Sequence, residues 1–206
     1  MTVRIDHATT TGTFSLDGRT LEVENNVWVL GDNSECVVVD APHDTQAILA
    51  LVGNRRVTAI LLTHGHDDHI GAVGALWDET GAPIHLHPAD RLLWDLVYPG
   101  VGPDVDLHDG RRITVAGIDL HVLHTPGHSR GSVCFHVPDL GVLFAGDTIT
   151  ESGPGPTGGS FSDSVSIVGS IQRRLIPLPP ETVIHTGHGR SSTLEKVAPH
   201  ISSEAH

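Results

Sequence analysis

The densest group of chemically active side chains lies in the segment THGHDDHIGA, residues 63–72. It places His64, His66, Asp68 and His69 within six consecutive positions. If these polar side chains were buried without an ion, each would need a partner elsewhere in the protein. Neutral imidazole and carboxylate together are typical ligands of zinc, iron or manganese, whereas calcium prefers oxygen atoms. The segment therefore predicts one part of a metal site.

Three later segments offer the ligands that a single loop lacks. Each follows an apolar run and places a histidine or an aspartate beside glycine. The residues are His128 in HTPGHSRGS, Asp147 in FAGDT and His188 in HTGHG. Each segment alone is an ordinary turn, but four such loops in one chain predict a site at one edge of a core. Thr63 and Thr148 are candidate hydroxyl partners of the ligands.

The intervening residues predict the strands and helices that position these loops. VTAILLTH predicts an apolar strand that ends in the first histidine. Because apolar residues occupy both faces of this strand, both faces of the sheet are expected to be covered, the outer one by helices. A hairpin is expected around the turn DGRT, with strands at 14–16 and 21–23. Helices are expected over 44–53, 70–80, 88–96, 163–175 and 193–200. We expect one α/β domain over residues 1–206, with a two-sheet core and outer helices.

Composition narrows the range of functions. With 25 acidic and 12 basic residues, the formal net charge of −13 disfavours binding to nucleic acid or acidic membranes. No run is long and apolar enough for a membrane span, and residues 1–6 show no secretory pattern. Cys36 and Cys134 each lie in an apolar run, which predicts buried thiols in a reducing compartment. We expect a cytoplasmic protein, monomeric or homodimeric.

The motif H-x-H-x-D-H, here His64-Gly65-His66-Asp67-Asp68-His69, resembles that of the metallo-β-lactamase-fold hydrolase superfamily. The later segments follow in the family's order, and the resemblance runs from about Gly31 to Ser192. It implies an αββα sandwich of two mixed sheets with outer helices. It also implies two divalent metal ions, with zinc expected and iron or manganese as alternatives. The implied first site is His64, His66 and His128, and the implied second site is Asp68, His69 and His188, with Asp147 bridging both.

Two such ions, ~3.5–4 Å apart, activate a bridging hydroxide and polarise the scissile carbonyl. Asp68 is the expected catalytic residue, because it is placed to accept the proton of the nucleophile. The segments around His128, Asp147 and His188 look most like the glyoxalase II-like branch, which cleaves thioesters of small thiols. A thiolate leaves without much help from an acid. The thiol remains open: the sequence lacks the branch's GRTD, and its arginine-rich composition would suit an actinobacterium that uses mycothiol.

Three other functions fit the same residues. A lactonase of this fold would use a tyrosine near the oxyanion, and Tyr98 is the only tyrosine. A persulfide dioxygenase would hold a single iron, and a metal-binding module would have no activity. Arg130 and Arg190 follow two ligand loops and are candidates for binding a substrate carboxylate, although both suit an exposed surface. Phe161, in a Gly/Pro/Ser-rich loop, is a candidate pocket wall. The expected substrate is a small thioester or ester.

Overall fold

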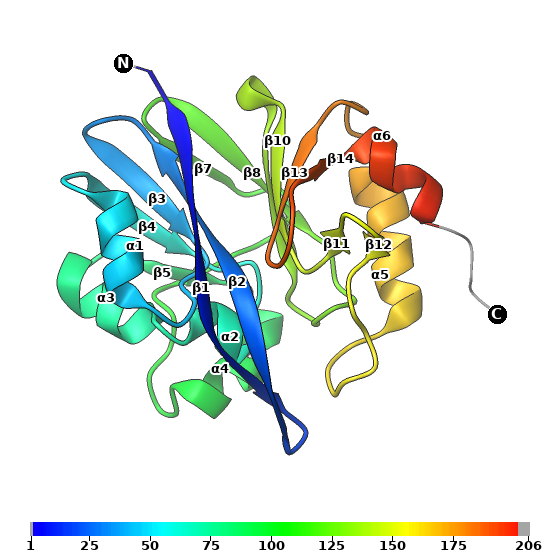
Figure 1. Ribbon diagram of the computed structural model, residues 1–206, viewed down its shortest axis with the longest axis horizontal. Helices are drawn as coiled ribbons and strands as arrows, with labels where there is room; N and C mark the ends of the chain where they lie inside the picture. The colour runs from blue at the N-terminus through cyan, green and yellow to red at the C-terminus, as the bar shows by residue number, and fades with distance from the viewer. Residues whose placement is uncertain (1, 202–206) are drawn as a thin grey trace.

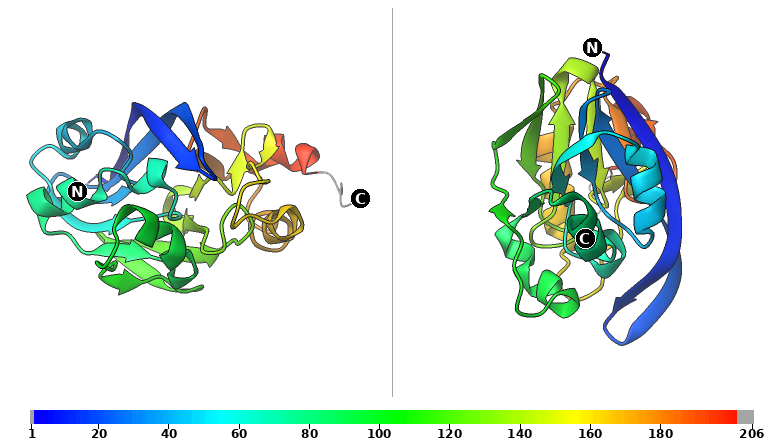
Figure 2. Two further views of the ribbon diagram at one scale, coloured as in Figure 1. Left: turned by 90° about the horizontal axis from the view of Figure 1, so that it is seen from below. Right: turned by 90° about the vertical axis from the view of Figure 1, so that its left-hand side faces the viewer.

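The computed structural model describes residues 2–201. Two six-stranded sheets are stacked against each other, with strand orders β1-β2-β3-β4-β5-β6 and β14-β13-β10-β9-β8-β7. Helices α1 and α3 cover the outer side of the first sheet, and α5 and α6 cover that of the second (Figures 1 and 2). This arrangement confirms the expected αββα sandwich with two mixed sheets.

The first sheet begins with a long antiparallel hairpin of β1 (Arg4–Leu16) and β2 (Arg19–Gly31), each of 13 residues. The expected hairpin covered only the tip of this one, because β1 alternates polar and half-exposed residues and carries almost no apolar signal. Strand β3 (Glu35–Val39) is antiparallel to β2 and parallel to β4 (Arg56–Leu61). Two short parallel strands, β5 (Ile84–Leu86) and β6 (Val105–Asp106), complete the sheet.

The second sheet consists mainly of antiparallel strands. Its strands are β7 (Arg112–Val115), β8 (Ile118–His124), β9 (Val133–Val137), β10 (Val142–Gly146), β13 (Val183–Thr186) and β14 (Ser192–Thr193). Only β10 and β13 run parallel, and a helical crossover connects them. A small ribbon pairs β11 (Ile149–Thr150) with β12 (Gly153–Pro154), and β12 lies in the Gly/Pro/Ser-rich segment expected to be loop.

The helices show one difference from expectation that affects the site. Instead of one helix over 70–80, the chain forms α2 (Asp67–Ile70) and α3 (Val73–Thr80). The second half of the histidine motif is therefore helical. The two acidic residues at the start of α2 favour this early start, since a helix N-terminus attracts negative charge. The Tyr98 hydroxyl accepts from the Gly74 N–H and lies within hydrogen-bonding distance of the Ile70 carbonyl, so it spans the break.

The remaining helices lie close to the expected ranges, except for the short η2 (Pro138–Leu140), where no helix was expected. Helix α1 (Thr45–Val52) begins at Asp44, whose carboxylate accepts from two N–H groups, as expected. The others are η1 (Pro88–Asp90), α4 (Arg91–Val97), η2 (Pro138–Leu140), α5 (Ser164–Ser170), η3 (Ile171–Leu175), α6 (Leu194–Val197) and η4 (Ala198–His200). Within residues 2–201, no helix has the length and apolar character that a membrane crossing needs.

Apolar side chains form three layers that hold the sandwich together. The central layer, which includes Trp28, Phe135 and Phe144, lies between the sheets, and the outer layers lie beneath the helices. Cys36 and Cys134 are buried and unpaired, as expected, and burial raises the pKa of both thiols to about 11. Their reduced nucleophilicity fits a role in packing.

Candidate metal centre

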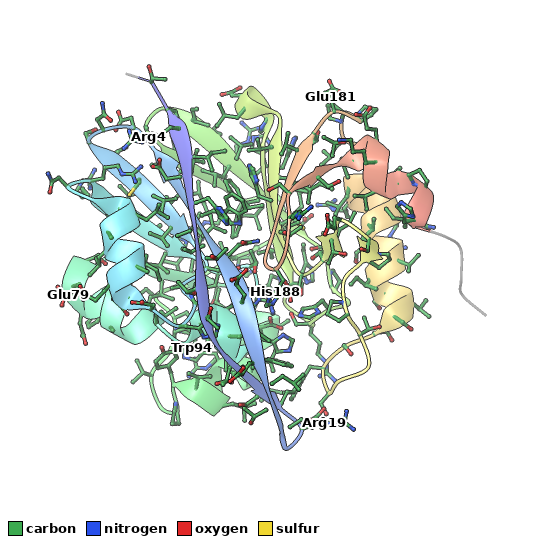
Figure 3. The ribbon with its side chains drawn as sticks, viewed as in Figure 1. Arg4, Arg19, Glu79, Trp94, Glu181 and His188 are labelled. Carbon is green, nitrogen blue, oxygen red and sulfur yellow. The ribbon has the colours of Figure 1, made fainter. Side chains whose placement is uncertain are left out.

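The structure brings all seven predicted ligands together. They come from the loops that follow β4, β8, β10 and β13, together with the first turn of α2. Figure 3 shows His188 beside β2, in the middle of the molecule. All seven side chains except His188 are almost fully buried. Tyr98 lies outside this group and serves the packing of α2 against α3.

The first three histidines form a compact group. His128 Nε2 lies 3.0 Å from His66 Nδ1 and 3.2 Å from His64 Nε2. The three rings stand nearly perpendicular to one another, with interplanar angles of 89°. Three nitrogen atoms thus face one point, which is the arrangement that a tetrahedral or five-coordinate metal ion requires.

The second group lies directly beside the first. His188 Nε2 is 3.3 Å from His69 Nε2 and 3.2 Å from Asp68 Oδ2. Asp147 stands between the groups, with Oδ2 3.5 Å from His128 Nε2 and 3.3 Å from His188 Nε2. A carboxylate in this position can contact ions in both groups at once.

Hydrogen bonds on the outer side of three histidines indicate that their inner nitrogens carry lone pairs. The Nδ1 atoms of His69, His128 and His188 lie 2.7–2.9 Å from acceptor oxygens of Asp40, Pro156 and Glu24 respectively. Each Nδ1 therefore donates outward, which leaves Nε2 as an acceptor facing other acceptors. In His66 it is Nδ1 that faces the group, 3.0 Å from His128 Nε2. Lone pairs directed at one point fit a cation, so the residues present suit two metal ions.

The electrostatics of the two groups differ. Burial is the main cause that lowers the pKa of His64 well below its usual value and that of His66 to about 3. Burial also acts on His188, but the hydrogen bonds that its imidazolium donates to Asp147 and Asp68 outweigh burial and raise its pKa to about 10. Burial would raise the pKa of Asp68, yet His69 and His188 lower it to about 2. His64 and His66 are therefore neutral, whereas the second group pairs carboxylate with imidazolium when no metal is bound.

Two buried aspartates that the sequence did not single out hold the ligand loops. Asp40, at a φ of 58°, accepts from the Thr63 N–H at 2.8 Å and from His69 Nδ1 at 2.9 Å. Thr63 also lies 3.1 Å from His64 Nδ1, as expected of a hydroxyl partner. Since Asp40 directly ends the apolar run ECVVVD, its position at a strand end was the available signal.

Asp90 joins the first ligand loop to the second, which carries His128. Its carboxylate accepts from the N–H groups of Gly65 (2.9 Å) and Gly131 (2.6 Å) and from the Ser129 hydroxyl (2.6 Å). A Cβ at Gly131 would lie 2.7 Å from the Asp90 carboxyl carbon, so this close approach requires glycine. Asp90 is only 1% exposed, and burial raises its pKa despite these donors. No local sequence pattern marked it.

A pocket of about 500 Å³ opens beside the first group, with His66 and His128 in its wall. One side is the tip of the β1–β2 hairpin, including Phe14, Arg19 and Leu21, and the opposite side is the loop over residues 156–162. The Ser160 N–H donates to Asp17 at 2.8 Å, which connects the two sides. The Asp67 carboxylate, inside the histidine motif, accepts from the Ser15 N–H at 3.0 Å and so ties the hairpin to α2.

The other candidate substrate contacts lie away from the first group. Arg130 is exposed and its guanidinium carbon lies 5.9 Å from the centre of the Phe161 ring, so these two residues contact each other. Arg190 is exposed beyond His188. The lining of the pocket includes none of the three. Arg19, on the hairpin, is the cationic side chain of that lining, and the sequence did not identify it.

Comparison with known proteins identifies the class. The sequence matches the metallo-beta-lactamase superfamily over residues 21–188, and the chain therefore belongs to that superfamily. Its members are metal-dependent hydrolases that bind divalent metals, and this chain has histidine and aspartate groups that could hold such ions.

The chain is also similar to individual curated proteins. An uncharacterized protein of Mycobacterium tuberculosis is 37% identical over 200 residues, covering 82% of this chain and 88% of that protein. A hydroxyacylglutathione hydrolase of Fuscovulum blasticum is 35% identical over 172 residues. That match covers 80% of this chain but only 62% of the enzyme.

Two solved structures share the fold at similar identity. A B3 metallo-beta-lactamase, BLEG-1, superposes with a TM-score of 0.78 and 30% identity, covering 96% of this chain and 100% of that one. TTHA1623, solved in a di-iron-bound form, gives a TM-score of 0.73 and 31% identity, covering 91% of this chain and 96% of that one. Both likenesses extend over nearly the whole of each chain.

Proposed function

We propose that this protein is a dinuclear metal hydrolase that cleaves a thioester of a small-thiol conjugate. The observation that carries the proposal is the convergence of two ligand groups on either side of one carboxylate, Asp147. In this proposal His64, His66 and His128 hold one divalent ion, and Asp68, His69 and His188 hold the other. Because the ligands come from both sheets, residues 1–206 act as one hydrolase domain.

The chain's own residues have three tasks in this reaction. When bound, two divalent ions lower the pKa of a water molecule and polarise the substrate carbonyl. Asp68 is catalytic: its carboxylate is buried beside His69 and His188 and takes the proton released by the nucleophile. Asp40 and Asp90 hold the ligand loops rigid, and the apolar hairpin tip binds the organic part of the substrate.

Two considerations favour a thioester. The likeness to a hydroxyacylglutathione hydrolase supports it, and a thiolate leaves near neutral pH without a proton donor. Arg19 on the pocket wall suits a carboxylate of the thiol carrier. The carrier thiol is either glutathione or mycothiol, and comparing the hydrolysis of their thioesters distinguishes the two. Zinc is the proposed metal, although the di-iron form of TTHA1623 makes iron the first alternative.

One other substrate class has a specific observation in its favour. The fold superposes on that of the B3 metallo-beta-lactamase BLEG-1 over nearly all of both chains. β-Lactams therefore belong beside lactones as competing substrates. A mononuclear-iron persulfide dioxygenase differs in metal count and in its use of oxygen.

Metal content and hydrolysis, measured together on the purified protein, test the proposal. We expect two divalent ions per chain and turnover of glutathione or mycothiol thioesters, with β-lactams and lactones hydrolysed at least tenfold less efficiently. A single iron with oxygen consumption would replace the proposal with the dioxygenase. Preferred hydrolysis of β-lactams or lactones would retain the centre but overturn the substrate. Absence of stoichiometric metal would refute the whole proposal.

A further inference from the structure

Asn25 on β2 lies against the second ligand group, although it belongs to none of the predicted motifs. It is completely buried. Its terminal amide atom, Nδ2, lies 2.9 Å from Asp68 Oδ2, 3.3 Å from His69 Nε2 and 3.3 Å from His188 Nε2. One amide atom is thus close to all three candidate ligand atoms of that group.

These four atoms form a nearly regular tetrahedron. The three separations among Asp68 Oδ2, His69 Nε2 and His188 Nε2 are 3.2, 3.3 and 3.6 Å, and those to the Asn25 amide are 2.9–3.3 Å. The centre of a tetrahedron with edges of this length lies about 2.0 Å from each corner, which is the usual distance from zinc to nitrogen or oxygen. The amide atom therefore stands where a further ligand would stand.

We propose that Asn25 is a further protein ligand of the second metal ion, beside Asp68, His69, His188 and the shared Asp147, and binds it through its amide oxygen. The inference rests on the proposed dinuclear centre. An amide nitrogen has no lone pair to offer, so the carboxamide must turn by half a rotation to place Oδ1 at this corner. The oxygen and nitrogen ends are almost equal in size, so the turn needs no repacking.

His43 provides the partner that the turned amide requires. At present Asn25 Oδ1 lies 2.8 Å from His43 Nε2. After the turn, Asn25 Nδ2 occupies this position and donates to His43 Nε2, which accepts when the imidazole proton is on Nδ1. Strand β1 leaves room for the ring, because a Cβ at Gly12 would lie 2.2 Å from His43 Nδ1. The pair thus satisfies the amide in either orientation.

The simpler interpretation is that Asn25 only donates a hydrogen bond to Asp68. The two roles make opposite predictions for an aspartate at position 25. A carboxylate supplies an oxygen to the ion, so a ligand role survives Asn25→Asp. A carboxylate cannot donate to Asp68 and instead repels it, so a donor role is lost.

The test is a competition titration of zinc against a chromophoric chelator, with the full chain in four forms. These are wild type, Asn25→Ala, Asn25→Asp and the control Asn33→Ala, which removes an exposed asparagine at the β2–β3 turn. We expect Asn25→Ala to weaken the second equivalent at least tenfold and leave the first unchanged. We expect Asn25→Asp and the control to stay within threefold of wild type or to bind more tightly.

A crystal structure of the zinc-loaded wild type gives a readout that charge does not affect. It should show Asn25 Oδ1 about 2.0–2.4 Å from the second ion. Wild-type affinity in Asn25→Ala, equal weakening of Asn25→Asp, or an amide turned away from the ion would overturn the inference and leave the dinuclear proposal intact. Failure of wild type to bind a second equivalent would instead refute the proposed function itself.

Discussion

The bottom of the candidate centre and the rim of its pocket differ in how their side chains are held. At the bottom, buried ligand atoms have further partners, such as Asp40 behind His69 and Asp90 between two loops. At the rim, the hairpin tip and the loop over 156–162 are largely exposed. Hydrogen bonding from Ser160 to the Asp17 carboxylate joins them. In the proposed function, the buried and densely hydrogen-bonded bottom determines the type of reaction, and the exposed rim determines the choice of substrate.

The largest effect should come from removing the catalytic carboxylate at the bottom. Asp68→Ala removes both a candidate metal ligand and the proton acceptor, so we expect kcat to fall about 10²–10⁴-fold and the second metal to be lost. Steady-state kinetics and metal analysis measure both. The matched control is Asp67→Ala, which alters the adjacent acid and should retain both metals and kcat. Equal loss in the two variants would contradict the distinction between bottom and rim.

Asp90→Ala should destabilise the bottom of the centre without touching a ligand. Three buried donors, on Gly65, Ser129 and Gly131, lose their acceptor, and we expect unfolding free energy to fall by about 2–4 kcal/mol. Urea denaturation of the metal-free protein measures this change. Asp95→Ala removes a half-exposed acid from α4, the helix that follows Asp90, and should cost less than about 0.5 kcal/mol. Similar losses in both variants would show that Asp90 does not join the loops.

A change at the rim should affect substrate binding only. Leu21 is 58% exposed and lines the pocket, so Leu21→Ser should weaken substrate binding by about 1 kcal/mol, or ~5-fold in KM, with kcat unchanged. Val165→Ser alters a similarly exposed residue on α5, away from the pocket lining, and serves as control. A fall in kcat for Leu21→Ser would mean that the rim also positions the reacting atoms.

The smallest effect should follow loss of the bond across the rim. Hydrogen bonds from Ser160 lower the pKa of Asp17, so the carboxylate form is favoured in the folded protein. Its contribution is therefore present above the ordinary carboxyl pKa and is lost as pH falls through the lower folded value. We expect Asp17→Ala to raise KM less than threefold, equally at pH 6 and pH 8. Limited proteolysis should cut the 156–162 loop faster, and an unchanged cleavage rate would speak against the bond.

The same contrast explains what the sequence could and could not predict. The histidines and Asp147 were recognisable because their type and their place after apolar strands both point to metal binding. Asp90 was not recognisable, since its partners lie 25 and 41 residues away and only tertiary contact brings them together. Asn25 was not recognisable either, because it lies in the β-rich run NNVWVLG, which contains no metal-binding motif. The hairpin was underestimated because β1 packs only one half-exposed face and lacks an apolar pattern.

The break between α2 and α3 shows a second reason for incomplete prediction. The sequence from Ile70 onward favours one continuous helix, but the structure forms a short helix over Asp67–Ile70 and begins a second one at Val73. The hydroxyl of Tyr98, which directly follows α4, contacts the backbone on both sides of the break. A local pattern does not contain this contact, so the motif was predicted as loop where the structure forms a helical turn.

The long β1–β2 hairpin has a consequence for how enzymes of this shape diversify. Side chains alternate in direction along a strand, so inserting two residues into each arm lengthens the pocket wall and keeps every inward residue inward. Such an insertion near Asp17 leaves Asn25 and its neighbours in register, since the pairing of β2 with β3 begins only at Trp28. Evolution can therefore deepen or shorten the substrate pocket in steps of about one pleat while the metal-binding end of the protein stays unaltered.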